Sequence, residues 1–201
     1  MTGITHGTAL WYASRATGVV TLLLLTAVLL LGILVNRQGR LPGLPSFAVT
    51  GLHRNVSLLA VAFLAIHVIT AIVDPYVTIG LAAAVLPFVS SYKPFWLGLG
   101  AISLDLIAAL ILTSLARARM NRRAWRGIHW LAYAAWPLAV VHSIGSSSDA
   151  RSGLVLGVLT GCALAVAVAL AWRLSRAAQE IPRAARAAAT LSRMPARKAD
   201  L

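Results

Sequence analysis

The sequence predicts an all-α fold, a polytopic membrane helical bundle of five transmembrane spans plus a short interfacial or re-entrant segment. Hydrophobic residues make up 59% of the 201 residues and charged residues only 11%, with a mean hydropathy of +0.82. The apolar residues gather in runs of about 20, the length that a helix needs to cross a bilayer. The net charge of +13 does not indicate nucleic-acid binding, because the basic residues lie between and after these runs instead of forming one soluble patch.

The spans follow one another along the chain with clear breaks between them. The first, about 9–35, ends in the loop sequence NRQGRLPGLPS, and it is too long and lacks the flanks of a cleaved signal, so we expect it to be retained. The second, about 51–73, stops at Asp74-Pro75. The next apolar stretch is cut by Pro87 and Pro94, which favours an interfacial or re-entrant piece. The remaining spans are expected at about 96–115, 128–144 and 154–172.

The basic residues predict which side each end occupies, because cytoplasmic loops retain Lys and Arg. Three basic residues fall on the predicted outer side: Arg15, Lys93 and Arg151. The others lie at the two inner connections or in the tail: Arg37, Arg40, Arg54, Arg117, Arg119, Arg122, Arg123, Arg126 and seven residues from Arg173 to Lys198. We therefore expect a multi-pass protein of the cell membrane with its N-terminus outside and its C-terminus cytoplasmic. Residues 176–201 would form a basic tail, either a partial helix on anionic lipid or disordered.

Four histidines on the second and fourth spans are the most informative polar residues. His53 and His67 are fourteen residues apart, which returns the helix to within about 40° of the same face and separates the two imidazoles by roughly 21 Å. Both spans run from inside to outside, so His53 and His129 fall near the inner end and His67 and His142 near the outer end. Because ionisable residues inside a span are costly, they suggest function, and paired imidazoles favour b-type haem, which needs no cysteine motif.

Other interpretations of these histidines remain open. A single membrane histidine often only bonds a neighbouring backbone, and a proton relay or metal transporter would favour intramembrane carboxylates, of which only Asp105 is present. His129 and His142 are thirteen residues apart, which leaves the second ring roughly 140° from the first on an ideal helix. Pro137 lies between them and can kink or retwist the span. The single cysteine, Cys162, cannot build a disulfide or iron–sulfur site within the chain.

Four stretches resemble the ferric reductase-like transmembrane domain, which ferric reductases, NADPH oxidases and the haem-binding membrane subunit of the bacterial methionine sulfoxide reductase system share. They are WYASRATGVV, LHRNVSLLAVAFLAIHV, SSYKPFWLGLG and RAWRGIHWLAYAAWPLAVVH. They are most similar to the short stand-alone actinobacterial members, and the resemblance covers about residues 10–172. It implies a di-haem domain over 1–175, with His53 and His129 ligating the inner haem and His67 and His142 the outer one.

Three arginines are candidate partners for haem propionates. Arg15 lies about one turn inside the outer end of the first span, where it would pair a propionate or snorkel to the interface. Arg54 and Arg126 lie at the inner ends of the histidine spans, where sidedness alone also explains them. Asp105 would take part in a proton path, bond a ligand histidine or stay protonated within the bundle. The small-residue repeat of Gly153, Gly157 and Gly161 favours close helix packing, within the bundle or against a partner.

The resemblance implies a transmembrane electron-transfer subunit, an oxidoreductase component without catalytic residues of its own. Nothing after Trp172 resembles an FAD or NADPH domain, so no flavin is expected on this chain and it cannot take hydride from a nicotinamide by itself. Electrons would pass from the cytoplasmic side or from quinol to an outer acceptor: ferric iron, oxygen or a separate partner, which we expect to be flavin-binding. The alternatives are a haem-free scaffold or proton-coupled transporter, and a haem sensor or store.

Overall fold

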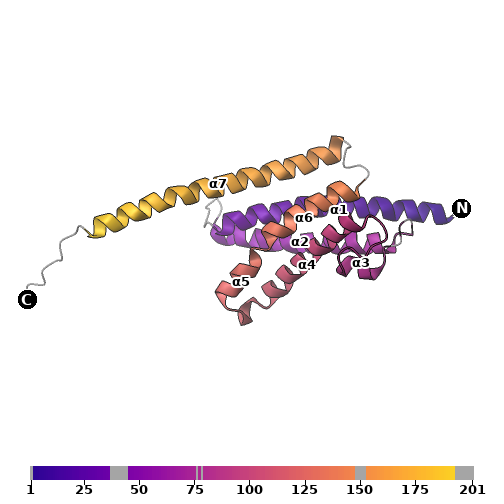
Figure 1. The fold of residues 1–201 in the computed structure, drawn as a ribbon, viewed down its shortest axis with the longest axis horizontal. Coiled ribbons are helices and arrows are strands. Elements are labelled where there is room, and N and C mark those ends of the chain that lie inside the picture. The colour runs from indigo at the N-terminus through magenta and orange to yellow at the C-terminus, as the bar shows by residue number, and fades with distance from the viewer. Residues whose placement is uncertain (1, 37–44, 76, 78, 148–152, 193–201) are drawn as a thin grey trace, which may run out of the picture.

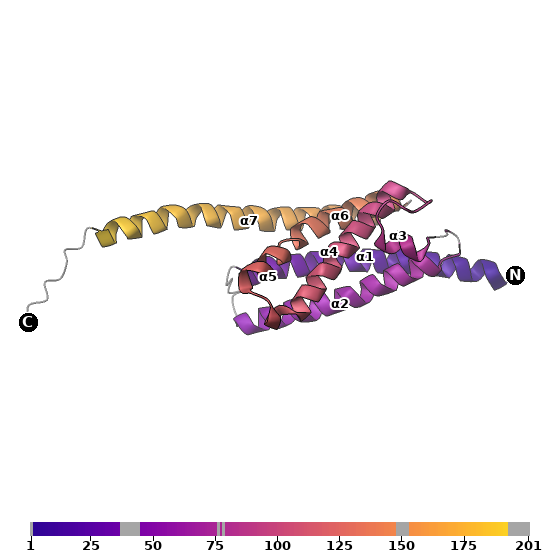
Figure 2. The same ribbon diagram turned by 60° about the horizontal axis from the view of Figure 1, so that its bottom comes forward.

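A computed structural model describes residues 2–36, 45–75, 77, 79–147 and 153–192, and every regular element among them is a helix (Figure 1). In chain order they are α1 (Thr2–Asn36), α2 (Ser46–Val73), α3 (Leu81–Val85), α4 (Pro94–Leu115), the 3₁₀ turn η1 (Arg117–Arg119), α5 (Arg122–His129), α6 (Ala132–Ser146) and α7 (Gly153–Ser192). Helices α1 and α2 pack along each other, α6 packs against both α1 and α4, and α4 runs at an angle to the α1–α2 hairpin (Figures 1 and 2). The predicted helical membrane bundle is therefore confirmed.

Within the described ranges, four helical segments are long and apolar enough to cross a membrane: Ala9–Val35, Phe47–Val73, Pro94–Leu115 and Gly153–Ser175. These agree with the first, second, third and fifth predicted spans. Their outer surfaces carry many exposed leucines, valines and isoleucines, as expected of helices that face lipid. The chain is therefore a membrane protein, whereas the number of crossings and the sidedness of the termini stay predictions.

The predicted fourth span is not one helix, which corrects the sequence-based expectation. It is divided into α5 and α6 at Trp130–Leu131, and α6 has only 15 residues. Around the break the backbone bonds run from residue i to i+3, for example from the Leu131 amide to the Ile128 carbonyl at 2.9 Å. Such a turn rotates the chain by about 120° per residue instead of about 100°. The break thus rotates the chain between His129 and His142. We expected this irregularity at Pro137, six residues later.

The α1–α2 hairpin is antiparallel and forms one half of the bundle. Leu29 and Ile33 of α1 are buried, one helical turn apart on the same face. Threonine hydroxyls in α1 bond back to the preceding turn, as Thr26 does to the Leu22 carbonyl at 2.8 Å, so these polar groups need no water inside the membrane. The indole of Trp136 donates to the Thr26 hydroxyl at 2.9 Å. This tryptophan therefore ties α6 to α1 inside the bundle.

The segment between the second and third spans contains only the five-residue helix α3. It is too short to cross a membrane, which agrees with the predicted interfacial or re-entrant piece. Phe88 then adopts a positive φ of 67° and lies against Gly98 of α4, where a Cβ would be 2.2 Å from the phenyl ring. Lys93 donates to the carbonyls of Gly145 and Ser146 and so closes the C-terminal end of α6.

Helix α7 lies along α1 and then continues past the rest of the bundle (Figures 1 and 2). It is one helix as far as Ser192, so the part of the predicted tail that the structure describes is helical, and residues 193–201 lie outside the described ranges. The guanidinium of Arg173 donates to the Tyr133 hydroxyl and lies 4.8 Å from the Trp130 ring. The glycine repeat is exposed, with open space at each Cβ position, so it does not pack within the bundle.

Candidate functional site

The four histidines meet in two pairs, each joining α2 to the α5–α6 segment. The ring centroids of His53 and His129 are 6.4 Å apart, and those of His67 and His142 are also 6.4 Å apart. We call His53/His129 the inner pair and His67/His142 the outer pair, after the sidedness that the sequence predicts. The structure thus brings together the residues that the sequence assigns to each leaflet, in the predicted combinations.

The separation of the rings suits two imidazoles that share one metal ion. An imidazole nitrogen binds zinc at about 2.0–2.1 Å, and the ring centre lies ~1.1 Å behind it, so two rings on opposite sides of one ion have centroids roughly 6.3 Å apart. Both observed distances agree with this value. The planes of the two rings are inclined by 62° in the inner pair and by 74° in the outer pair. Edge-to-face rings in direct contact have centroids about 4.5–7 Å apart, so the distance fits both direct contact and a shared ion, and the donor atoms of the rings decide between them.

The outer pair is oriented by hydrogen bonds to backbone carbonyls of neighbouring helices. The distance from His67 Nδ1 to the Ser14 carbonyl oxygen is 2.8 Å, and His142 Nδ1 lies equally close to the Trp96 carbonyl oxygen. Because a carbonyl oxygen only accepts, each Nδ1 must carry the proton. In a neutral imidazole this leaves the Nε2 lone pair free, which is the tautomer and the arrangement of histidines that ligate metals.

The inner pair is held differently. The Nδ1 atoms of His53 and His129 are both buried and have no hydrogen-bond partner. The backbone of Val28 approaches His53, fourteen residues after Ser14, but without the geometry of a regular bond. His129 is instead covered by the indole of Trp125, with centroids 4.7 Å apart and planes inclined by 24°. Stacking on Trp125 therefore positions the His129 imidazole, whereas hydrogen bonds position the imidazoles of His67 and His142.

Three glycines face the histidines and make room for their rings. A Cβ on Gly18 would lie 3.0 Å from His67 Cε1, and one on Gly32 would lie 3.5 Å from His53 Cε1. On α4, a Cβ on Gly100 would lie only 2.6 Å from His142 Nδ1. Our sequence reasoning missed these positions. A signal was present in α1, because Gly18 and Gly32 repeat the fourteen-residue spacing of the histidines on α2 that they face.

A cavity of about 290 Å³ surrounds the outer pair between α1, α2, α4 and α6. It is at the lower end of the size range of small-molecule and cofactor sites. Arg15 lines it, donates to the Ser147 hydroxyl at 2.9 Å and lies 4.0 Å from the centroid of the Trp11 ring. Asp74, where the second predicted span stops, is buried and also lines the cavity. Arg15 is thus placed beside the outer pair, as the propionate hypothesis requires.

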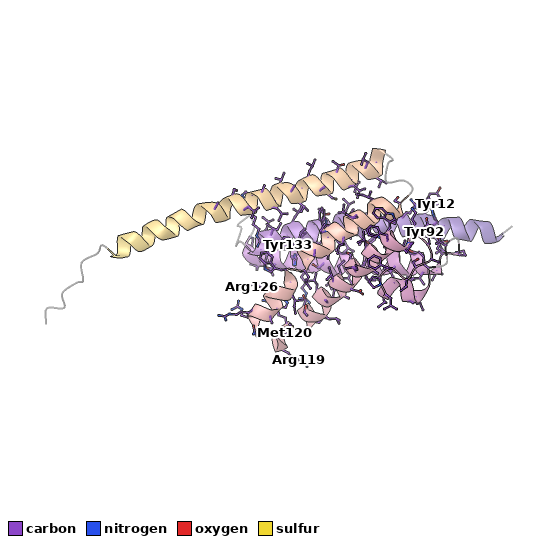
Figure 3. The ribbon with its side chains drawn as sticks, in the orientation of Figure 1. Tyr12, Tyr92, Arg119, Met120, Arg126 and Tyr133 are labelled. Atoms are coloured by element: carbon purple, nitrogen blue, oxygen red, sulfur yellow. The ribbon has the colours of Figure 1, made fainter. Side chains whose placement is uncertain are left out.

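The remaining predicted residues lie outside this cavity. Arg54 and Arg126 are exposed, each close in sequence to one histidine of the inner pair. Figure 3 shows Arg126 near Arg119 and Met120, at the opposite end of the bundle from Tyr12 and Tyr92. Asp105 is exposed and makes no hydrogen bond or ion pair with any residue of the described ranges, so it does not bond a histidine there. His6 has no described side chain.

The donor set limits the kind of ion that the pairs suit. Each pair offers two nitrogen ligands, and the residues that the structure describes contain no cluster of three or more metal-ligating side chains. A bare ion with four protein ligands would need more. Two axial imidazoles are instead sufficient for an iron that already has four equatorial ligands from a porphyrin. The residues present therefore fit a haem at each pair.

Comparison with known protein families gives a match to a family of membrane domains. Residues 17–140 match the family model described as ferric reductase like transmembrane component. The match extends from α1 into α6 and includes Gly18, Gly32 and three of the four paired histidines. No curated protein and no solved structure matches the chain. Because the family model covers more than half of its residues, the chain belongs to the ferric reductase-like transmembrane family, whose members are generally haem-binding and whose domain indicates electron transfer in a membrane.

Proposed function

We propose that this chain is a transmembrane electron-transfer subunit in which the inner pair and the outer pair each hold one b-type haem. The observation that carries the proposal is the equal 6.4 Å separation of the two pairs. A haem between two imidazoles supplies one-electron transfer through the ferric and ferrous states of its iron. Two such sites at different depths would connect the two membrane surfaces.

The protein's own residues would fix the ligands and keep water away from them. The carbonyls of Ser14 and Trp96 hold the two imidazoles of the outer pair with Nε2 free, and Trp125 stacks on the His129 imidazole of the inner pair. Each haem would be held by two histidines of this chain, and we propose that neither pair binds a substrate at the iron. We therefore propose a relay that passes electrons to another molecule and does not activate a substrate at the iron.

Arg15 would neutralise a propionate at the outer site, because it lies within the cavity and presents a fork of donors. We propose weaker roles of the same kind for Arg54 and Arg126, which are exposed and so are screened by solvent. With the predicted sidedness, electrons would enter at the inner pair, from a cytoplasmic donor or quinol. They would leave at the outer pair for a flavin-binding partner, ferric iron or oxygen.

Electron transfer across a sealed membrane tests the proposal. Liposomes with trapped ferricyanide and purified, haem-loaded protein should oxidise a membrane-impermeant reductant that is added outside. The His142→Ala variant should abolish this transfer while the protein still reconstitutes. A haem-loaded protein that transfers no electrons would favour the sensor or storage alternative. A folded protein that binds no haem would favour a scaffold or transporter.

A further inference from the structure

A second, smaller cavity lies at the inner end of the bundle, where α4 turns through η1 into α5. Its volume is about 80 Å³, and it is lined by Arg117, Met120, Arg122, Trp125 and Arg126. A cavity needs about 10–15 Å³ to hold one water molecule, so this one holds on the order of five water-sized atoms. That is the size of one tetrahedral oxyanion.

The cavity offers hydrogen-bond donors and positive charge. Three guanidiniums line it, and none makes a hydrogen bond or ion pair with a described residue. The indole Nε1 of Trp125 is buried and also lacks an acceptor. Since an indole N–H can only donate, leaving it buried and unpaired costs free energy that an acceptor would recover. The Met120 thioether, a weak acceptor, is the remaining lining side chain.

The chain has little means of neutralising this cluster itself. Its five acidic residues are Asp74, Asp105, Asp149, Glu180 and Asp200, and none falls in the segment 116–131 around the cavity. Asn121 does not compete for an anion, because its carboxamide oxygen already accepts from the amides of Arg123 and Ala124. Arg117, Arg122 and Arg126 are exposed, so an anion from outside the chain can reach all three guanidiniums.

We propose that this cavity binds the phosphate group of a ligand, held by Arg117, Arg122, Arg126 and the Trp125 indole. Several guanidinium forks and an N–H donor suit a phosphate with its multiple acceptor oxygens better than a singly charged carboxylate. The phosphate belongs either to an anionic lipid headgroup or to a soluble phosphate-bearing compound. Both sources would reach the site from the inner surface, the side that is rich in arginine.

The site is linked to the inner pair through one aromatic ring. The Arg117 guanidinium lies 4.5 Å from the Trp125 ring centroid, and the centroid of the His129 imidazole lies 4.7 Å from the same ring. A bound phosphate would order this stack and place negative charge beside the inner ligand. The effect on an inner haem rests on the proposed function, whereas phosphate binding itself does not.

Calorimetric titration with inorganic phosphate tests the inference. The full-length protein is purified in maltoside, which contains no phosphate, and washed until phosphorus analysis finds no bound lipid. We expect saturable binding of one phosphate per chain, weakened at least tenfold in Arg117→Gln and in Arg122→Gln. The matched control Arg123→Gln removes an exposed charge from the same helix without touching the cavity, so its affinity should equal that of the parent.

A second titration, after phosphatidylglycerol is added to the micelles, distinguishes the two sources. Loss of phosphate binding would identify the lipid headgroup, and unchanged binding would identify a soluble compound. Failure of the parent to bind phosphate, or equal binding by the Arg117→Gln and parent proteins, would overturn the inference. So would binding that disappears when haem is loaded, since a propionate would then occupy the cavity. A haem-loaded protein that binds no phosphate would leave the proposed electron transfer intact.

Discussion

Gly100 of α4 lies directly against the imidazole of His142, so close that a methyl group in place of its hydrogen would come within 2.6 Å of Nδ1. The same Nδ1 donates to the Trp96 carbonyl at 2.8 Å, one turn earlier on α4. One face of α4 thus both orients this histidine and leaves space for its ring. The relation explains why a glycine is present in the middle of a helix, where it costs about 1 kcal/mol relative to alanine.

Gly100→Ala should therefore disturb the outer pair. The added methyl would displace the imidazole and weaken its bond to Trp96, and overpacking of this kind costs about 1–3 kcal/mol. We expect loss of the outer haem, seen as a fall from two haems per chain to one in a pyridine haemochrome assay. Gly157→Ala is the control, because a Cβ there meets open space on α7 and should leave both haems in place. Two haems in Gly100→Ala would contradict the account.

Gly18 and Gly32 of α1 should differ in their sensitivity to substitution. A Cβ on Gly18 would lie 3.0 Å from His67, whereas one on Gly32 would lie 3.5 Å from His53, an ordinary contact distance. Gly18→Ala should lower the haem content of the outer site, and Gly32→Ala should leave the inner site close to normal. Redox titration of each variant checks this, because we expect the two proposed haems to titrate at different potentials. The reverse order of effects would show that the α1–α2 register differs from the one described.

The contact between Trp136 and Thr26 should stabilise the bundle. Their hydrogen bond of 2.9 Å joins α6 to α1, and a bond of this kind contributes about 1 kcal/mol. In a double-mutant cycle with Trp136→Phe and Thr26→Ala, we expect a coupling free energy of that size in reversible unfolding by detergent. Additive effects of the two substitutions would mean that the indole N–H gains nothing from the hydroxyl.

Arg15 should raise the potential of the outer site alone. Its positive charge lies in the cavity beside His67 and His142, so it favours the reduced state of an iron held there. Arg15→Gln should lower that potential by on the order of tens of millivolts and leave the inner potential unchanged. Spectroelectrochemistry measures both values in one experiment. Arg119→Gln is the control, because Arg119 is exposed at the other end of the bundle, and this substitution should change neither potential.

The pairing of the histidines could be predicted because polar residues stand out in apolar spans and because their spacing and direction assign each to one leaflet. The glycines could not be distinguished in the same way, since a glycine in a membrane helix also fits simple close packing. The contact of Trp136 with Thr26 depends on the packing of helices far apart in the sequence, so no pattern along the chain indicates it.

The break at Trp130–Leu131 was missed for a local reason. No proline marks it, and although the Gly127 carbonyl accepts one of its i to i+3 bonds, the sequence offers Pro137 as the more obvious irregularity. Helix α5, which leads into the break, contacts α4, and no pattern in the span indicates that contact. Helix α7 continues beyond the predicted fifth span because the following residues are rich in alanine, the best helix former.

Haem stoichiometry of the purified protein, with its reduced-minus-oxidised spectrum, tests the central claim most directly. The parent should contain two b-type haems per chain, and the His67→Ala and His129→Ala variants should each contain one. The two variants should retain haems of different potential, because they remove ligands from different pairs. A parent with one haem or none, or two variants that lose the same haem, would contradict the assignment of the pairs His53/His129 and His67/His142.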